Sequence, residues 1–249
     1  MPERGKRQRL DILLTERGLA VSREQARRLI MAGAVVVDEQ RIDKPGALVN
    51  PGALLRIKDE ARARYVSRGG YKLEAALHAF AIDVTGVVAL DVGASTGGFT
   101  DCLLQHGAAK VFAVDVGYGQ LAWSLRQDHR VINLERCNIR TLEQNLLDEI
   151  PTLAVIDASF ISLTLILPKV LTLIAPLGTV IALIKPQFEV GKGRVGKGGV
   201  VRDPALHAEV VARLHVQAKE WNVAVKGVVE SPLLGPKGNK EFFICLQKR

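Results

Sequence analysis

Two lysines and two carboxylates that lie far apart in the sequence could together take a proton from a weakly acidic hydroxyl group. They are Lys72, Asp157, Lys185 and Glu241. A lysine accepts such a proton only if its pKa falls well below about 10.4. Burial and a second cation lower a lysine pKa, whereas nearby carboxylates raise it. Any one of the four could equally be half of a surface ion pair, so a joint site requires a fold that brings all of them together.

Seven short apolar segments, with helical segments between most of them, predict a sheet that could bring these four residues together. Asp157 and Lys185 each end one such segment, and ligands bind at the carboxyl edge of parallel sheets. We therefore predict a doubly wound α/β sheet. Its last two strands should form an antiparallel hairpin, because a short loop without a helix joins them. The predicted strands are Val87–Val92, Lys110–Asp115, Val131–Leu134, Leu153–Asp157, Thr179–Lys185, Ala224–Val229 and Phe242–Leu246.

A glycine-rich segment directly after the first predicted strand indicates a nucleotide cofactor, because glycines let the backbone approach a ligand closely. Asp115, 22 residues beyond Gly93, could hold ribose hydroxyls. Dinucleotide enzymes share this arrangement. The segment is not G-x-G-x-x-G, however, and a terminal hairpin is typical of methyltransferase sheets, which favours S-adenosylmethionine. The predicted cofactor-binding residues are Asp91, Gly93, Ala94, Ser95, Thr96, Gly97, Gly98, Asp115 and Asn138.

Two further segments suggest functions that we reject. The apolar run Ile161–Ile184 is long enough for a membrane span, but Lys169 lies within it and two prolines interrupt it. A helix ending near Ala175, a turn and a buried strand explain it better. Residues 191–198 resemble a phosphate-binding loop but lack its final Ser or Thr and the helix that follows. We interpret Gly191–Val201 as a mobile basic loop over the substrate.

The first 68 residues are strongly basic, with 15 Lys and Arg against nine Asp and Glu, whereas the whole chain has a net charge of +8. A basic end on a near-neutral body is typical of nucleic-acid-binding modules, although it could also be a solvated face. Ser22 is placed to cap a second helix, on which Arg23 and Arg27 share one face.

The segment RLDILLTERGLAVSREQARRLIMAGAVVVDEQRIDKPGALV resembles the alpha-L RNA-binding motif of ribosomal proteins and RNA-modifying enzymes. The resemblance implies that basic side chains grip the RNA backbone, which agrees with clustered arginines neutralising phosphates. We expect residues 1–60 to form an RNA-binding domain, 61–68 a linker and 69–249 the α/β domain. The expected RNA-binding residues are Arg9, Arg23, Arg27, Arg28 and Lys44, with Arg62 and Arg64 of the linker.

Four further segments, YVSRGGYKLEAAL, VIDASF, LIKPQFE and KGNKEFFICL, resemble the FtsJ/RrmJ-like ribose methyltransferases, and the chain as a whole resembles the TlyA family. The resemblance implies a Rossmann-like, seven-stranded sheet behind a small α+β RNA-binding domain. It also implies 2'-O-methylation of ribosomal RNA, on cytidine of 16S and/or 23S rRNA, with S-adenosylmethionine as cofactor. Lys72, Asp157, Lys185 and Glu241 match the family's K-D-K-E tetrad. We predict Lys185 as the base, Asp157 and Lys72 as orienting groups, and Glu241 as the group that fixes the substrate.

Two other functions stay open at this point: a membrane-permeabilising haemolysin, as the family's historical name implies, and a ribosome-binding factor without activity. The intact tetrad argues against the second, and the absence of a predicted spanning helix against the first. Cys102, Cys137 and Cys245 are odd in number and widely spaced, which favours a reducing cytoplasm over a disulfide framework. No cluster of ligands predicts a metal.

Overall fold

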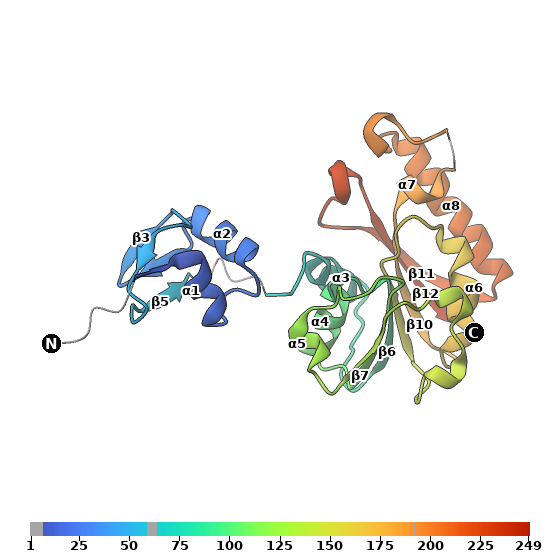
Figure 1. Ribbon diagram of the computed structural model, residues 1–249. Coiled ribbons are helices and arrows are strands. Elements are labelled where there is room, and N and C mark those ends of the chain that lie inside the picture. The colour runs from blue at the N-terminus through green and yellow to red at the C-terminus, as the bar shows by residue number, and fades with distance from the viewer. Residues whose placement is uncertain (1–6, 59–63, 192) are drawn as a thin grey trace. The chain divides into compact units, whose positions relative to one another are not determined.

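A computed structural model of the chain describes residues 7–58, 64–191 and 193–249, which fall into two compact units, Met1–Arg64 and Tyr65–Arg249 (Figure 1). The division lies inside the segment that we expected to be a linker. Tyr65 is 2% exposed and packs in the core of the second unit, so the end of that segment belongs to the α/β unit. Arg62 lies outside the described residues.

The N-terminal unit packs two helices against short strands around a small apolar core. Leu10, Leu14 and Ile30 are completely buried in that core. Ser22 caps the second helix by accepting the backbone N–H of Gln25, as predicted. The elements are β1 (Gln8–Arg9), α1 (Leu10–Glu16), α2 (Arg23–Met31), β2 (Val35–Val37), β3 (Gln40–Ile42), β4 (Leu48–Val49) and β5 (Leu55–Ile57). Strands β1 and β4 pair, and β2 lies between β3 and β5.

The second unit is built on one seven-stranded sheet with the order β11-β12-β10-β9-β6-β7-β8. Its strands are β6 (Val88–Val92), β7 (Lys110–Val114), β8 (Val131–Leu134), β9 (Leu153–Ile156), β10 (Thr179–Ile184), β11 (Val223–Glu230) and β12 (Phe242–Lys248). Strand β12 runs antiparallel to both neighbours, which confirms the predicted terminal hairpin. Strand β6 lies between β7 and β9. The chain therefore changes direction across the sheet at β6, where ligands bind in such folds.

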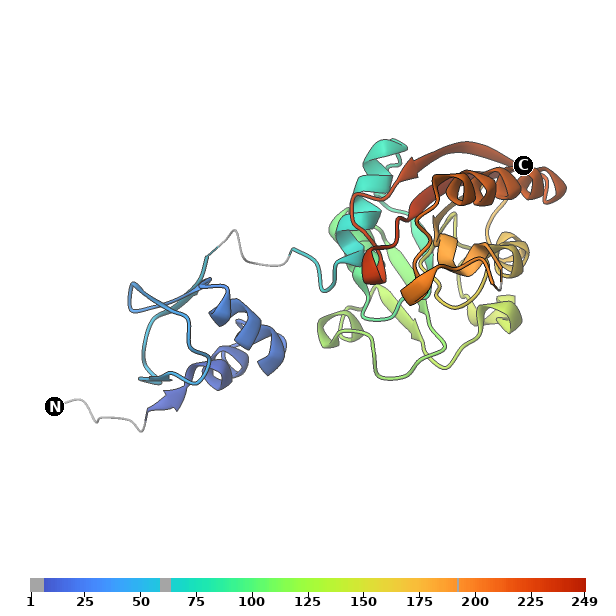
Figure 2. The ribbon, with the colours of Figure 1, turned by 90° about the horizontal axis from the view of Figure 1, so that it is seen from above.

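Helices cover both faces of this sheet (Figures 1 and 2). Leu90 and Phe112 point into a core beneath α6 and α8, whereas Ala89 and Val111 point into a second core beneath α3 and α4. Residues on both faces of the central strands are buried, which is why these strands are continuous apolar runs. The helices are α3 (Gly69–Ala79), α4 (Gly98–Gln105), α5 (Trp123–Arg126), α6 (Leu167–Leu173), α7 (Pro186–Glu189) and α8 (Pro204–Glu220).

Between α6 and β10 the chain folds as the sequence predicted for the apolar run. Helix α6 ends at Leu173, and Pro176 to Gly178 lead into the buried strand β10. Helix α8 starts with Pro204 after the N-cap Asp203, whose side chain accepts the Ala205 N–H. Within the described part of the chain, none of the helices combines the length and the apolar character needed to cross a membrane.

Candidate active site

The turn after β6 brings the glycine-rich segment against the end of β9. Gly93 has a φ of +84°, and a Cβ atom there would lie 2.8 Å from the main-chain oxygen of Asp157. An L-residue with a side chain would be strained by that φ and too close to the neighbouring backbone. Glycine at this position therefore lets the two strand ends carrying the predicted cofactor and catalytic residues lie side by side.

Asp115, directly after β7, fixes this turn through both carboxylate oxygens. Oδ2 accepts the Ser95 N–H at 2.8 Å, and Oδ1 accepts the Gly117 N–H at 2.6 Å. The Ser95 hydroxyl also contacts Gln120. A carboxylate has further lone pairs, so Asp115 can hold the turn and still accept hydrogen bonds from a ligand.

A cavity of about 1040 Å³ opens beside this turn and is large enough for a nucleoside cofactor together with a target nucleotide. Gly93, Ser95, Asp115 and Asn138, all predicted cofactor-binding residues, line it. The Asn138 side chain accepts the Arg140 N–H at 3.1 Å, which fixes its orientation at the cavity wall. The lining, with a carboxylate beside a close backbone turn and apolar walls, fits a ribose and a base.

The other predicted cofactor-binding residues lie in different places. Ala94, Thr96 and Gly98 line a smaller cavity next to the first. Gly97 lies against the side chains of Leu121 and Leu125 and lines neither cavity. Asp91 is completely buried and also lines neither cavity. Contacts of these residues with a cofactor remain predictions.

Asp91 is a carboxyl group in an apolar environment. Its Oδ2 accepts the Thr100 hydroxyl at 2.7 Å, and Oδ1 makes no hydrogen bond to any described residue. Burial raises the pKa of Asp91 to about 7, and the charges of Asp157 and Asp115 add to this, while the Thr100 hydrogen bond opposes it. Asp91, in β6 two residues before Gly93, is therefore partly protonated at neutral pH.

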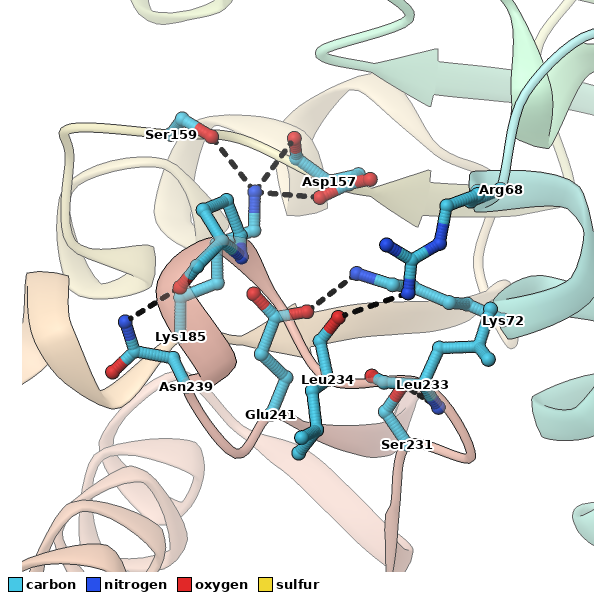
Figure 3. Close-up of polar contacts among 12 residues, drawn as sticks. Arg68, Lys72, Asp157, Ser159, Lys185, Ser231, Leu233, Leu234, Asn239 and Glu241 are labelled. Carbon is cyan, nitrogen blue, oxygen red and sulfur yellow. Dashed lines mark hydrogen bonds and ion pairs between the residues drawn. The ribbon is translucent and has the colours of Figure 1, made fainter. Parts of the chain in front are cut away.

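The structure brings the four predicted catalytic residues together as two ion pairs (Figure 3). Lys185 Nζ lies 2.6 Å from Asp157 Oδ1, and Lys72 Nζ lies 2.6 Å from Glu241 Oε2. Lys72 comes from α3, Asp157 and Lys185 follow β9 and β10, and Glu241 precedes β12. Both lysines are buried except for 8% of their surface. Lys72, Asp157 and Lys185 line the smaller cavity, of about 300 Å³.

Glu241, which we predicted to fix the substrate, is completely buried and does not line that cavity. Its side chain contacts Lys72 instead. A Cβ atom at Gly235 would lie too close to the Glu241 carboxylate and would force it to shift, so glycine at this position leaves room for the Lys72–Glu241 pair. Arg68 donates to the Leu234 carbonyl at 3.4 Å in the same loop. These contacts join α3 to the terminal hairpin.

Three residues of the site were not predicted from the sequence. Ser159 Oγ accepts a hydrogen bond from Lys185 Nζ at 2.8 Å. Phe160 is 90% exposed, has a φ of +63°, and lies with its ring centroid 5.0 Å from that of Phe188. Both rings line the larger cavity. Their positions in the sequence could have identified them. Ser159 and Phe160 closely follow Asp157, and Phe188 follows Lys185, at the same edge of the sheet.

In the N-terminal unit, one buried carboxylate holds two of the predicted RNA-binding arginines. Arg9 lies 3.0 Å and Arg23 3.1 Å from the completely buried Asp11. The hydrogen bond from Arg9 is the largest of the effects that lower the pKa of Asp11 to about 2. Both arginine side chains remain about half exposed.

The remaining predicted RNA-binding residues that the structure describes are also exposed. Arg28 pairs with Glu24 one helical turn away, at 3.3 Å. Arg27, Lys44 and Arg64 lie on the surface. Contacts of all these residues with RNA remain predictions. Among the described residues, no group of three or more His, Cys, Asp and Glu side chains could hold a metal ion.

Comparison with known proteins identifies a family for each of the two units. Residues 65–248 match the FtsJ-like methyltransferase family, and residues 8–55 match the S4 domain. The chain is 49% identical over 242 residues to the 16S/23S rRNA (cytidine-2'-O)-methyltransferase TlyA of Mycobacterium tuberculosis, covering 97% of this chain and 90% of TlyA. It is 39% identical over 235 residues to Hemolysin A of Brachyspira hyodysenteriae, covering 94% and 97% of the two chains.

A solved structure from Streptococcus thermophilus, whose name assigns it to the hemolysins, has 46% identity and a TM-score of 0.75. It covers 98% of this chain and 89% of its own. The family match spans most of the sequence, and the relatives carry both units. The chain therefore belongs to the FtsJ-like methyltransferase family, in the TlyA type that joins an S4 domain to the methyltransferase fold.

Proposed function

We propose that this protein methylates the 2'-hydroxyl group of a cytidine ribose in 16S or 23S ribosomal RNA, with S-adenosylmethionine as cofactor. The observation that carries the proposal is the pair of lysine–carboxylate contacts around the smaller cavity, directly beside the glycine turn. TlyA of M. tuberculosis, at 49% identity, is named for this reaction.

The Lys185 amine is placed to accept the hydroxyl proton. A neutral lysine amine has two N–H groups and one lone pair. Lys185 Nζ donates to the Ser159 hydroxyl at 2.8 Å and to the Asp157 main-chain oxygen at 3.4 Å, and the Asp157 carboxylate lies 2.6 Å away. The two hydrogen-bond acceptors can hold the two N–H groups of the neutral amine. The lone pair is then left for the ribose hydroxyl. Once Lys185 holds the proton, the Asp157 carboxylate stabilises the resulting ammonium charge electrostatically.

Lys72 supplies a second positive charge at the same cavity. Negative charge develops on the ribose oxygen as it loses its proton, and a fixed ammonium group stabilises that charge without having to reorganise. Glu241 holds Lys72 from the buried side. We therefore assign Glu241 to positioning Lys72, rather than to the substrate contact that the sequence suggested.

Asp115, Asn138 and the turn at Gly93–Ser95 would hold the cofactor along the larger cavity. When bound, S-adenosylmethionine supplies a methyl group already activated for displacement. The contribution of the protein is then mainly to position the hydroxyl in line with it. The exposed ring of Phe160, backed by Phe188, offers a surface on which the target base can stack.

The N-terminal unit contributes affinity for the RNA backbone. Its basic residues include Arg9 and Arg23, which both pair with Asp11 and whose side chains are about half exposed. Such contacts neutralise phosphates with little dependence on base identity. Selection of the nucleotide is therefore assigned to the methyltransferase unit.

The proposal is tested with purified protein, labelled S-adenosylmethionine and ribosomal subunits. Wild-type protein is expected to transfer label to rRNA. Lys185→Met is expected to bind the cofactor with affinity within about threefold of wild type but to transfer no label. Lys226→Met, on the exposed edge of β11, serves as the matched control and should retain activity. Loss of cofactor binding together with activity in Lys185→Met would mean that Lys185 does not act as the base.

A further inference from the structure

A buried glutamate joins the two segments that carry the catalytic pair. Glu189, the last residue of α7, is 4% exposed and lies four residues after Lys185. Its Oε1 accepts the Leu163 N–H at 2.7 Å, and its Oε2 accepts the Ser162 hydroxyl at 2.7 Å. Both partners belong to the segment that begins at Asp157. The Glu189 carboxylate therefore links the segment after β10 to the segment after β9.

Arg213 on α8 completes the surroundings of this carboxylate. Its guanidinium group lies 3.3 Å from Glu189 Oε2 and donates to the Glu189 main-chain oxygen at 2.5 Å. A buried carboxylate is unfavourable unless it is paired and hydrogen bonded. Glu189 meets both conditions, and its contacts with Arg213 hold α7 against the side of the long helix α8 (Figure 1).

Three sets of contacts, one after another along the two segments, therefore hold the segments together. Lys185 binds Asp157 and Ser159 at one end, the ring of Phe188 lies against that of Phe160 in the middle, and Glu189 binds Ser162 and Leu163 at the other end. Phe160 lies between the two polar contacts. Its φ of +63° is unfavourable for a residue with a bulky side chain, so it persists only because the flanking residues are held.

We propose that Glu189 is a positioning residue for methyl transfer, an inference that rests on the proposed function. By holding residues 157–163 against α7, it fixes the ring of Phe160 and the amine of Lys185 relative to one another. It touches neither cavity itself. Small displacements of reacting groups reduce rates by about 100-fold, so its effect should fall on the rate of the chemical step rather than on cofactor binding.

The test uses the full-length protein, ribosomal subunits and S-adenosylmethionine. Glu189→Gln is expected to lower kcat by about 10- to 100-fold. The KM for the cofactor should stay within about threefold, and the thermal unfolding transition should remain above the assay temperature. Glu149→Gln, which removes an exposed carboxylate paired with Lys110, is the matched control and should leave kcat unchanged.

A double-substitution cycle separates positioning from a general loss of stability. If Glu189 acts through the segment around Phe160, Glu189→Gln should slow the Phe160→Ala variant only slightly further. Independent sites would instead give effects that multiply. Multiplying effects, or a Glu189→Gln kcat within twofold of wild type, would overturn the inference.

A second variant covers the case in which Glu189→Gln does not fold. Ser162→Ala removes one donor to the carboxylate and leaves its charge pair with Arg213 in place. It is expected to lower kcat by about three- to tenfold, and an unchanged kcat would likewise overturn the inference. Wild-type protein that methylates no rRNA would instead refute the proposed function itself.

Discussion

The buried carboxyl group of Asp91 makes the stability of the methyltransferase unit depend on pH. Its pKa is raised to about 7 from the ordinary value of 3.8, chiefly because burial disfavours the charged form. The folded protein therefore binds a proton that the unfolded chain releases between these two values. The free energy of unfolding should fall as pH rises from about 4 to about 7, because over this range the folded state binds more protons than the unfolded state.

The size of the effect follows from the shift. At about 1.4 kcal/mol for each pH unit, a shift of about three units corresponds to roughly 4 kcal/mol in total. Roughly 2–3 kcal/mol of this falls between pH 5 and pH 8. Asp91→Asn can still accept the Thr100 hydroxyl but cannot ionise. The variant should therefore gain stability relative to wild type by that amount over the same interval.

Urea unfolding followed by tryptophan fluorescence measures this difference. Both tryptophans, Trp123 and Trp221, lie in the second unit, so the signal follows that unit and not the S4 unit. Other titrating groups contribute equally to both proteins and cancel in the difference. A difference in unfolding free energy that is the same at pH 5 and pH 8 would show that Asp91 ionises normally and would refute the reasoning.

Two further predictions concern the active site and the S4 unit. Gly235→Ala places a Cβ atom against the Glu241 carboxylate and should reduce the methylation rate by about 100-fold. Gly52→Ala, where the new atom has only ordinary contacts, should have no effect, and equal rates for both would argue against a role for the Lys72–Glu241 pair. A plot of the logarithm of RNA affinity against the logarithm of salt concentration should become less steep when Arg9 and Arg23 are replaced with Gln. The slope should change by about 1.4–1.8, as expected for the loss of two phosphate contacts. Filter binding across a salt series checks this, and an unchanged slope would mean that the pair held by Asp11 does not contact phosphates.

Much of the fold was predictable because the sheet is buried on both faces. Continuous apolar runs such as Thr179–Ile184 identify strands without any knowledge of their neighbours. Parallel strands end at a common edge, so Asp157 and Lys185 could be placed together from strand ends alone. Lys72 and Glu241 could be added only from the family resemblance, because α3 and the loop before β12 reach the site by tertiary packing.

The contacts that fix the site could not be predicted from local patterns. Glu189 resembles an ordinary charged residue in the sequence, and only packing between α7, α8 and the segment after β9 makes it a buried link. Tyr65 was assigned to a linker because charged residues precede it, yet its ring lies in the second core. Glu241 was expected at the substrate but is buried behind Lys72. For Glu189 and Glu241 the residue type was visible in the sequence, but the partner was distant.

The most direct measurement is the position of the methyl group on ribosomal RNA. Subunits incubated with S-adenosylmethionine and either wild-type protein or Lys185→Met are digested, and the modified nucleoside is identified by mass spectrometry. A methyl group on the ribose 2'-oxygen of cytidine with wild type, and none with the variant, is the predicted result. A methyl group on a base, or ribose methylation at the wild-type rate by Lys185→Met, would contradict proton removal by the lysine amine.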